Sequence, residues 1–135
     1  MMTVEERRVI VEAKLRDADE MMKVAAVNHE YEFYNSEVNR LYYACFHAAS
    51  AALVAIGIED VRRHEGVRNM FSLHYIKEGR IGLEWSSFYA TMFGSRSSAD
   101  YDNFKNFTKD QAEAMRPMVE SFLITIKEYL KTIGY

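Results

Sequence analysis

The longest apolar segment of the chain runs from Asn35 to Gly57 and is apolar on nearly every side. After Ser36, only five polar residues interrupt it: Glu37, Asn39, Arg40, His47 and Ser50. A helix that is apolar all round is normally the central helix of its fold, because neighbouring helices cover each of its faces. Gly57 is the residue type expected just beyond a helix C-terminus. The pattern therefore predicts a buried central helix over residues 35–57.

The other segments with apolar residues at helical spacing are 4–27, 64–77, 81–96 and 109–131. The first and last of these begin with a capping box, a threonine followed three residues later by Glu or Gln, at positions 3 and 108. The small polar residues of 94–101 predict a break or a weakening at the end of the third. Because no segment alternates long enough to predict a strand, we expect an all-α protein.

The predicted central helix has two different faces. One has the spacing of a core face and consists of Val38, Leu41, Cys45, Ala48, Ala52 and Ile56. On the opposite face, Arg40 and His47 are seven residues apart, so their directions differ by about 20° and their positions by about 10.5 Å along the axis. We call this face the Arg40–His47 stripe; it also carries Tyr43, Ala44, Ala51 and Val54.

Length and composition are those of an ordinary globular protein. The 135 residues fit a single domain, 1–135, that could bury about two thirds of its surface. With 17 basic and 20 acidic residues the net charge is −3, so there is no overall basic field to attract nucleic acid. Any contact with RNA must therefore come from a local patch.

Two features predict a cytoplasmic protein without a membrane span. The single cysteine, Cys45, excludes an internal disulfide and suits a reducing compartment, and the charged N-terminus is not a signal peptide. After His47, no stretch without a charge or histidine is longer than the eleven residues of 48–58, which is too short to cross a bilayer.

Several chemistries lack their motifs. The chain has no Glu-x-x-His pair for a di-metal bundle, no Cys-x-x-Cys or His-Glu-x-x-His metal motif and no glycine-rich phosphate loop. We therefore expect neither a metal site nor a cofactor. Cys45 and His47 point about 200° apart on a helix, so they do not form a nucleophile–base pair, and we expect Cys45 in the core.

Two interpretations of Arg40 and His47 are open. In the structural one, His47 is a satisfied core residue and Arg40 pairs with an acidic residue of a neighbouring helix. In the chemical one, they cleave RNA without a metal: a histidine transfers protons near neutral pH, and an arginine grips phosphate oxygens. One helix supplies one such histidine, so a two-fold dimer through this face would bring a second pair opposite the first.

The residues around this pair resemble a known signature. The sequence NRLYYACFHA over 39–48 resembles the N-R-x-Y-Y-A-x-F-H-A signature of HEPN-domain proteins. Three later segments resemble further motifs of the same branch: 64–66 its H-x-G turn, 74–79 its H-F-V-K-x-G stretch, and 96–102 its R-x-x-x-D-Y-D segment. The resemblance extends from about residue 10 to 131, which is nearly the whole chain.

The resemblance implies an up-and-down bundle of four to five helices that dimerises. It implies an R-x4–6-H motif that cleaves RNA without metal in active members, with Arg40 and His47 as the catalytic pair and Asn39 as the polar neighbour that orients them. It also implies a partner, because many such proteins are toxins encoded beside a small MNT-type nucleotidyltransferase that acts as the antitoxin.

Four more residues are candidates for contacting RNA or another ligand: Tyr43, His64, Arg96 and Tyr101. His64 either caps its helix or lines the site, and Arg96 either pairs with Asp100 or adds charge to an RNA cleft. Tyr101 is a candidate for stacking on a base. Two other functions stay open: a non-catalytic module that binds a nucleotidyltransferase, a nucleotide or RNA, which the acidic net charge favours, and a purely structural helical dimer.

Overall fold

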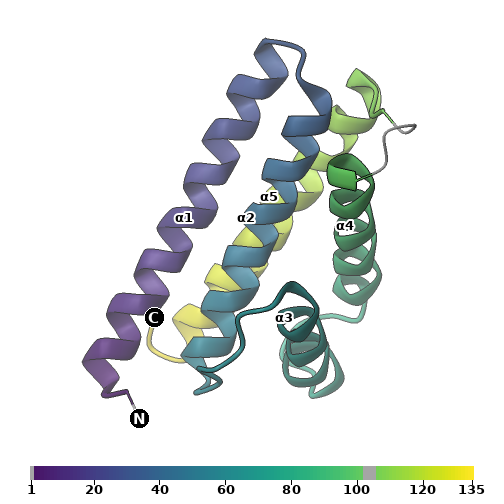
Figure 1. Cartoon of the computed structure of the whole chain (residues 1–135). Coiled ribbons are helices and arrows are strands. Elements are labelled where there is room, and N and C mark those ends of the chain that lie inside the picture. The colour runs from purple at the N-terminus through teal and green to yellow at the C-terminus, as the bar shows by residue number, and fades with distance from the viewer. Residues whose placement is uncertain (1, 102–105) are drawn as a thin grey trace.

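The computed structural model describes the backbone of residues 2–101 and 106–135 and the side chains of residues 2–95 and 106–135. Within these ranges it contains five α-helices and one short π-helix, and no strand. They are α1 (Val4–Glu30), α2 (Tyr34–Ala55), α3 (His64–Phe71), η1 (Ser72–Lys77), α4 (Glu84–Tyr101) and α5 (Lys109–Thr132). The predicted all-α fold, an up-and-down bundle of four to five helices, is confirmed (Figure 1).

Local sequence signals set the ends of the long helices. Thr3 and Thr108 both form the predicted capping boxes, in which the threonine hydroxyl accepts from the third helical N–H and the Glu or Gln side chain accepts from the threonine N–H. After α2, Gly57 has a φ of 90°, and the Ile58 N–H donates to the Leu53 carbonyl at 2.9 Å. This is a Schellman ending, and glycine suits its left-handed residue.

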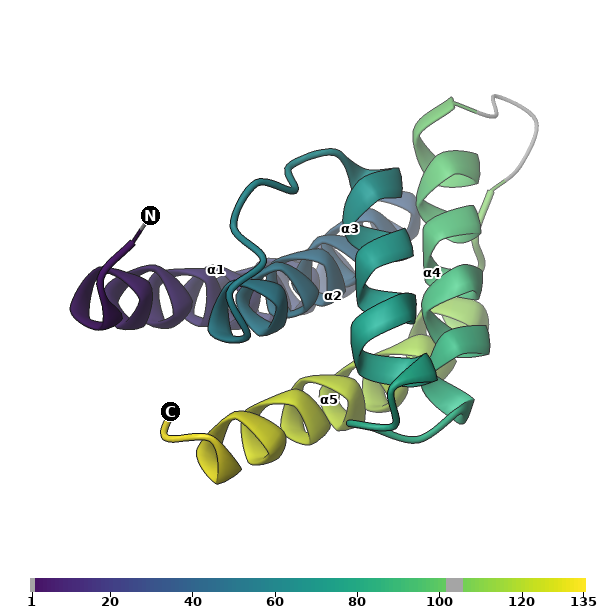
Figure 2. The same ribbon diagram turned by 90° about the horizontal axis from the view of Figure 1, so that it is seen from below.

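Helix α2 is the centre of the fold, as its apolar pattern predicts. It packs against α1, α3, α4 and α5, and its alanines, all buried, allow those helices to approach closely (Figure 1). The predicted core face is fully buried from Val38 to Ala52, whereas Ile56 is half-buried. Seen from below, α5 lies on one side of the α1–α2 pair, and the connector 56–63 arches over the other side (Figure 2). No described helix is long and apolar enough to cross a membrane.

Two of the predicted helices differ from the structure. Helix α4 continues through Gly94 to Tyr101, so the expected break is wrong. A glycine costs a helix interior only about 1 kcal/mol relative to alanine, and the buried Tyr89 and Met92 hold this helix against the core. The segment 64–77 is α3 followed by the π-helix η1, in which Tyr75 is buried and its hydroxyl donates to the Ala52 carbonyl of α2.

Candidate functional site

Tyr43 joins the two ends of the Arg40–His47 stripe. The Arg40 Cζ lies 5.8 Å from the centroid of the Tyr43 ring, and the His47 ring centroid lies 6.2 Å from the same ring. All three side chains come from α2 and are half-buried, so each is partly open to solvent. The predicted common face of Arg40, Tyr43 and His47 is therefore present, with the tyrosine ring between the cation and the imidazole.

The Arg40 guanidinium forms no ion pair with a described residue. Its Nη1 lies 3.9 Å from the Met21 sulfur of α1, and its other close neighbour is the Tyr43 ring. Neither a thioether nor an aromatic face neutralises the charge. The structural interpretation, in which Arg40 pairs with an acidic residue of a neighbouring helix, therefore finds no such partner in the part of the chain described.

His47 is placed to work as a neutral imidazole. Its ring lies against Tyr43 and against Phe46, at 5.7 Å between centroids, and it forms no hydrogen bond with a described residue. Burial lowers its pKa below the ordinary value of 6.5; Asp17 of α1 raises it and Lys14 lowers it, both by smaller amounts. The neutral form, which can accept a proton, therefore predominates near pH 7.

His64 lies beside the same aromatic residues from a different helix. Its Nδ1 is hydrogen-bonded to the hydroxyl of the buried Tyr42 at 2.8 Å, and its ring centroid is 4.4 Å from Phe46 and 5.4 Å from Tyr43. The alternative that His64 caps α3 is wrong, because Arg63 occupies the cap position and no side chain caps this helix. The structure thus brings His64 next to the stripe.

The structure describes less of the surroundings of the other predicted site residues. Asn39 precedes Arg40 on α2 and is buried. The side chains of Arg96 and Tyr101 lie outside the described residues, so the predictions about them stay predictions. Among the described residues, no group of three or more His, Cys, Asp or Glu gathers in the way that metal ligands do.

A buried charge cluster at the start of α2 was not anticipated from the sequence. Glu37 is completely buried; its Oε1 accepts from His29 Nδ1 at 2.8 Å, and its Oε2 lies 3.5 Å from Arg116 Nη2. His29 Nε2 also lies 3.3 Å from a carboxylate oxygen of Glu113. The signal in the sequence was an acidic residue within an apolar helix, which requires partners. We call these four residues the Glu37 cluster.

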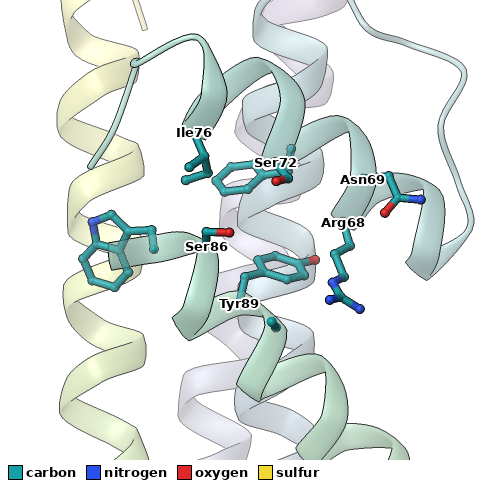
Figure 3. A pocket seen from close by; sticks show the side chains of 9 residues that line it. Arg68, Asn69, Ser72, Ile76, Ser86 and Tyr89 are labelled. Carbon is teal, nitrogen blue, oxygen red and sulfur yellow. The ribbon is translucent and has the colours of Figure 1, made fainter. Parts of the chain in front are cut away.

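Two cavities lie away from Arg40, Tyr43 and His47, none of which lines either cavity. One, of about 130 Å³, lies between α3–η1 and α4, where Arg68, Ser72, Ser86 and Tyr89 contribute polar groups (Figure 3). None of the stripe residues lines it. The second, of about 210 Å³, lies at the C-terminal end of α2 and includes Val54 of the stripe.

Comparison with known proteins agrees with the helical fold. A family model described as the HEPN domain matches residues 11–129. A UPF0332 protein of Thermotoga maritima is 31% identical over 128 residues, which cover 95% of this chain and 96% of that protein. A Methanocaldococcus jannaschii protein named "Putative toxin MJ0605" is 32% identical over 123 residues, which cover 91% of this chain and 90% of that protein. Another protein of that organism, named "Putative toxin MJ0142", is 28% identical over 120 residues, which cover 89% of this chain and 81% of that protein.

Proposed function

The chain belongs to the HEPN domain family, and we propose that it is an endoribonuclease of toxin type that cuts RNA without a metal ion. The observation that supports this most is the chemistry of one face of α2. It presents an arginine without an ion pair and a histidine whose pKa is lowered by burial, on either side of Tyr43. These are the groups needed to bind a phosphate and to accept a proton.

In the proposed reaction, the 2′-hydroxyl of the RNA attacks the adjacent phosphorus, and neutral His47 accepts the proton of that hydroxyl. The Arg40 guanidinium donates to the phosphate oxygens, on which negative charge grows. The bond from phosphorus to the 5′-oxygen breaks, and that oxygen takes up a proton. The products are a 2′,3′-cyclic phosphate and a 5′-hydroxyl end. Asn39 is the polar neighbour proposed to orient the pair.

The reaction needs a second proton-transfer group, and a two-fold dimer through the stripe supplies one. In such an isologous interface the stripe of one protomer faces the stripe of its partner, so two copies of Arg40 and His47 share one cleft. The aromatic residues beside the stripe, half-buried in the single chain, would become covered in this assembly. We propose this homodimer as the active form.

The toxin role is supported by the names of two relatives, each of which is named "Putative toxin". We propose that the protein acts on cytoplasmic RNA and that an MNT-type nucleotidyltransferase restrains it as the antitoxin. Co-expression tests this pairing: growth inhibition by the protein alone, relieved by the nucleotidyltransferase, is the expected result. Inhibition that persists with the partner bound would contradict it.

The nuclease itself is tested by incubating a structured RNA with the protein in EDTA. We expect wild type to cut, leaving 2′,3′-cyclic phosphate ends, and His47→Ala to lose about 10²–10⁴-fold in rate, the usual contribution of acid–base catalysis. His74→Ala is the matched control, because His74 lies on η1, pairs with Glu78 at 3.0 Å and is remote from the stripe in sequence. A folded wild type that leaves RNA intact would favour the non-catalytic binding module instead.

A further inference from the structure

We propose that the cavity at the C-terminal end of α2 is a nucleotide subsite, which binds a nucleotide of the RNA strand flanking the cleavage point. The inference rests on the proposed function, since it extends the stripe along the same strand. The cavity has about 210 Å³ and lies between α1, α2 and the connector 56–63. No motif in the sequence indicates it, because its lining comes from three separate segments.

The cavity continues the Arg40–His47 stripe. Val54, which lines it, is seven residues after His47, so it points within about 20° of the same direction and about 10.5 Å farther along α2. Lys14 of α1 connects the two places: it lines the cavity, and its charge acts on His47. A strand held at Arg40 and His47 and running toward the end of α2 therefore reaches this cavity next.

The charge of the lining favours an anion. Lys14 and Arg62 both line the cavity, and neither forms an ion pair with a described residue. The one carboxylate in the lining, Glu59, is already paired with Arg7, at 3.3 Å from Nη2 to Oε1. Two uncompensated cations beside a neutralised carboxylate form the local basic patch that an acidic protein needs to bind a phosphate.

Ser50 provides an independent indication of a ligand. It is only 5% exposed, it lines the cavity, and its hydroxyl forms no hydrogen bond with a described residue. The Ser50 hydroxyl is therefore available to donate to, or accept from, a ligand in the cavity. Because Ser50 is one helical turn after His47, a phosphate oxygen bound here would stay close to the reacting group.

The rest of the lining determines the class of ligand. The walls include apolar side chains such as Ile10, Leu53 and Ile58, against which a ribose or base can pack. The volume is below the 300–1,000 Å³ of pockets for drug-sized ligands, so it suits one nucleotide unit. No aromatic residue of the described part of the chain lines the cavity, so the base would not be held by stacking, and we expect little preference among the four bases.

The test measures binding separately from cleavage. A fluorescent single-stranded deoxyoligonucleotide, which lacks the 2′-hydroxyl and cannot be cut, is titrated with wild type, Arg62→Glu and Arg63→Glu. Arg63 is the matched control, because it is the exposed neighbour of Arg62 and does not line the cavity. We expect Arg62→Glu to weaken binding about tenfold and to reduce the slope of log affinity against log salt by about 0.7, one phosphate contact, with Arg63→Glu near wild type.

A second variant fills the cavity without changing charge. Ser50→Leu places an apolar side chain where the nucleotide would lie, and we expect weaker oligonucleotide binding from a protein with unchanged helical circular dichroism. Lys14→Glu and Lys23→Glu form another matched pair, because these residues are nine apart on α1 and point in opposite directions. Equal binding by Arg62→Glu, Ser50→Leu and wild type would overturn the subsite.

The two proposals can fail separately. Wild type that binds the deoxyoligonucleotide through Arg62 and Ser50 but never cuts RNA keeps the subsite and refutes the nuclease. Wild type that cuts RNA, with Arg62→Glu binding as tightly as Arg63→Glu, refutes the subsite and keeps the nuclease. A nucleoside 5′-monophosphate that competes with the oligonucleotide at similar concentrations would show that the cavity takes a free nucleotide rather than an RNA strand, and would overturn the flanking role.

Discussion

Two charged groups on the same helix, one turn apart, have opposite environments. Glu37 is completely buried, and each of its carboxylate oxygens has a partner, the His29 ring for one and the Arg116 guanidinium for the other. Arg40, three residues later, is half-buried; its guanidinium contacts a sulfur atom and an aromatic ring and forms no ion pair with a described residue. The fold therefore provides counter-ions where a charge is buried for structure, and leaves Arg40 without one.

This difference indicates that the charged residues of α2 have two kinds of role, one in stability and one in binding a ligand. A buried charge without a partner lowers the stability of the fold. The partners of Glu37 therefore indicate a structural role for the Glu37 cluster. An arginine that stays partly solvated without a counter-ion keeps its positive charge available for a ligand. The contrast favours a structural role for Glu37 at the start of α2 and supports the chemical role that we propose for Arg40 and His47.

The largest effect on stability is expected from removing both partners of the Glu37 carboxylate. His29→Ala with Arg116→Ala leaves a buried carboxylate without a partner, and we expect a loss of about 3 kcal/mol in unfolding free energy, the lower end for a broken buried ion pair. Urea denaturation measures it. Adding Glu37→Gln to this background should recover part of the loss, because the buried group is then neutral. No recovery would contradict the interpretation of the Glu37 cluster as a buried ion pair.

A smaller effect is expected from an exposed ion pair of similar geometry. Asp19 and Lys127 join α1 and α5 at 2.6 Å, but both side chains are more than one third exposed. Asp19→Ala should therefore change the unfolding free energy by less than about 1 kcal/mol. A loss as large as that of the His29→Ala, Arg116→Ala double variant would show that burial is not what distinguishes the Glu37 cluster.

The pH dependence of cleavage tests the proposed role of His47 as a base. Burial disfavours the imidazolium, so the folded protein loses the His47 proton at a lower pH than the unfolded chain, and the neutral base persists below pH 6.5. We expect the acidic limb of the rate profile to have its midpoint below 6.5. For the same reason, this residue makes the folded state less stable as the pH falls through 6.5 toward its folded pKa. NMR titration of the His47 ring, assigned with His47→Asn, measures the lowered pKa on which both expectations depend. A titration midpoint above 6.5 would contradict both.

The smallest effect is expected at Cys45. This residue is fully buried, and desolvation raises the pKa of its thiol far above the ordinary value. A thiol reagent should leave the native protein unmodified and react only after denaturation, which mass spectrometry can follow. Rapid labelling of the folded chain would place Cys45 near a surface and would contradict the predicted core face of α2.

The features that were predictable from the sequence depend on residues close together in the chain. Helical spacing located α2 and its two faces, and threonine with Glu or Gln three residues later located the starts of α1 and α5. The continuation of α4 past Gly94 was missed, because packing of Tyr89 and Met92 outweighs a weak local preference.

The features that were missed depend on partners far apart in sequence. Arg116 is 79 residues from Glu37, so no spacing rule connects them. His64 was a candidate helix cap, but its position is set by Tyr42 of α2, 22 residues earlier. The nucleotide subsite likewise needs Lys14, Ser50 and Arg62 from three segments, and only the folded chain brings them together.

The most direct test of the central claim measures two properties of Arg40→Ala, the unfolding free energy and the rate of RNA cleavage. We expect an unfolding free energy within about 1 kcal/mol of wild type, because no ion pair with a described residue is lost, together with loss of RNA cleavage. A stability loss of about 3–5 kcal/mol, the value for a broken buried ion pair, with any residual folded protein still cutting RNA, would contradict it. Arg40 would then be a structural residue like those of the Glu37 cluster.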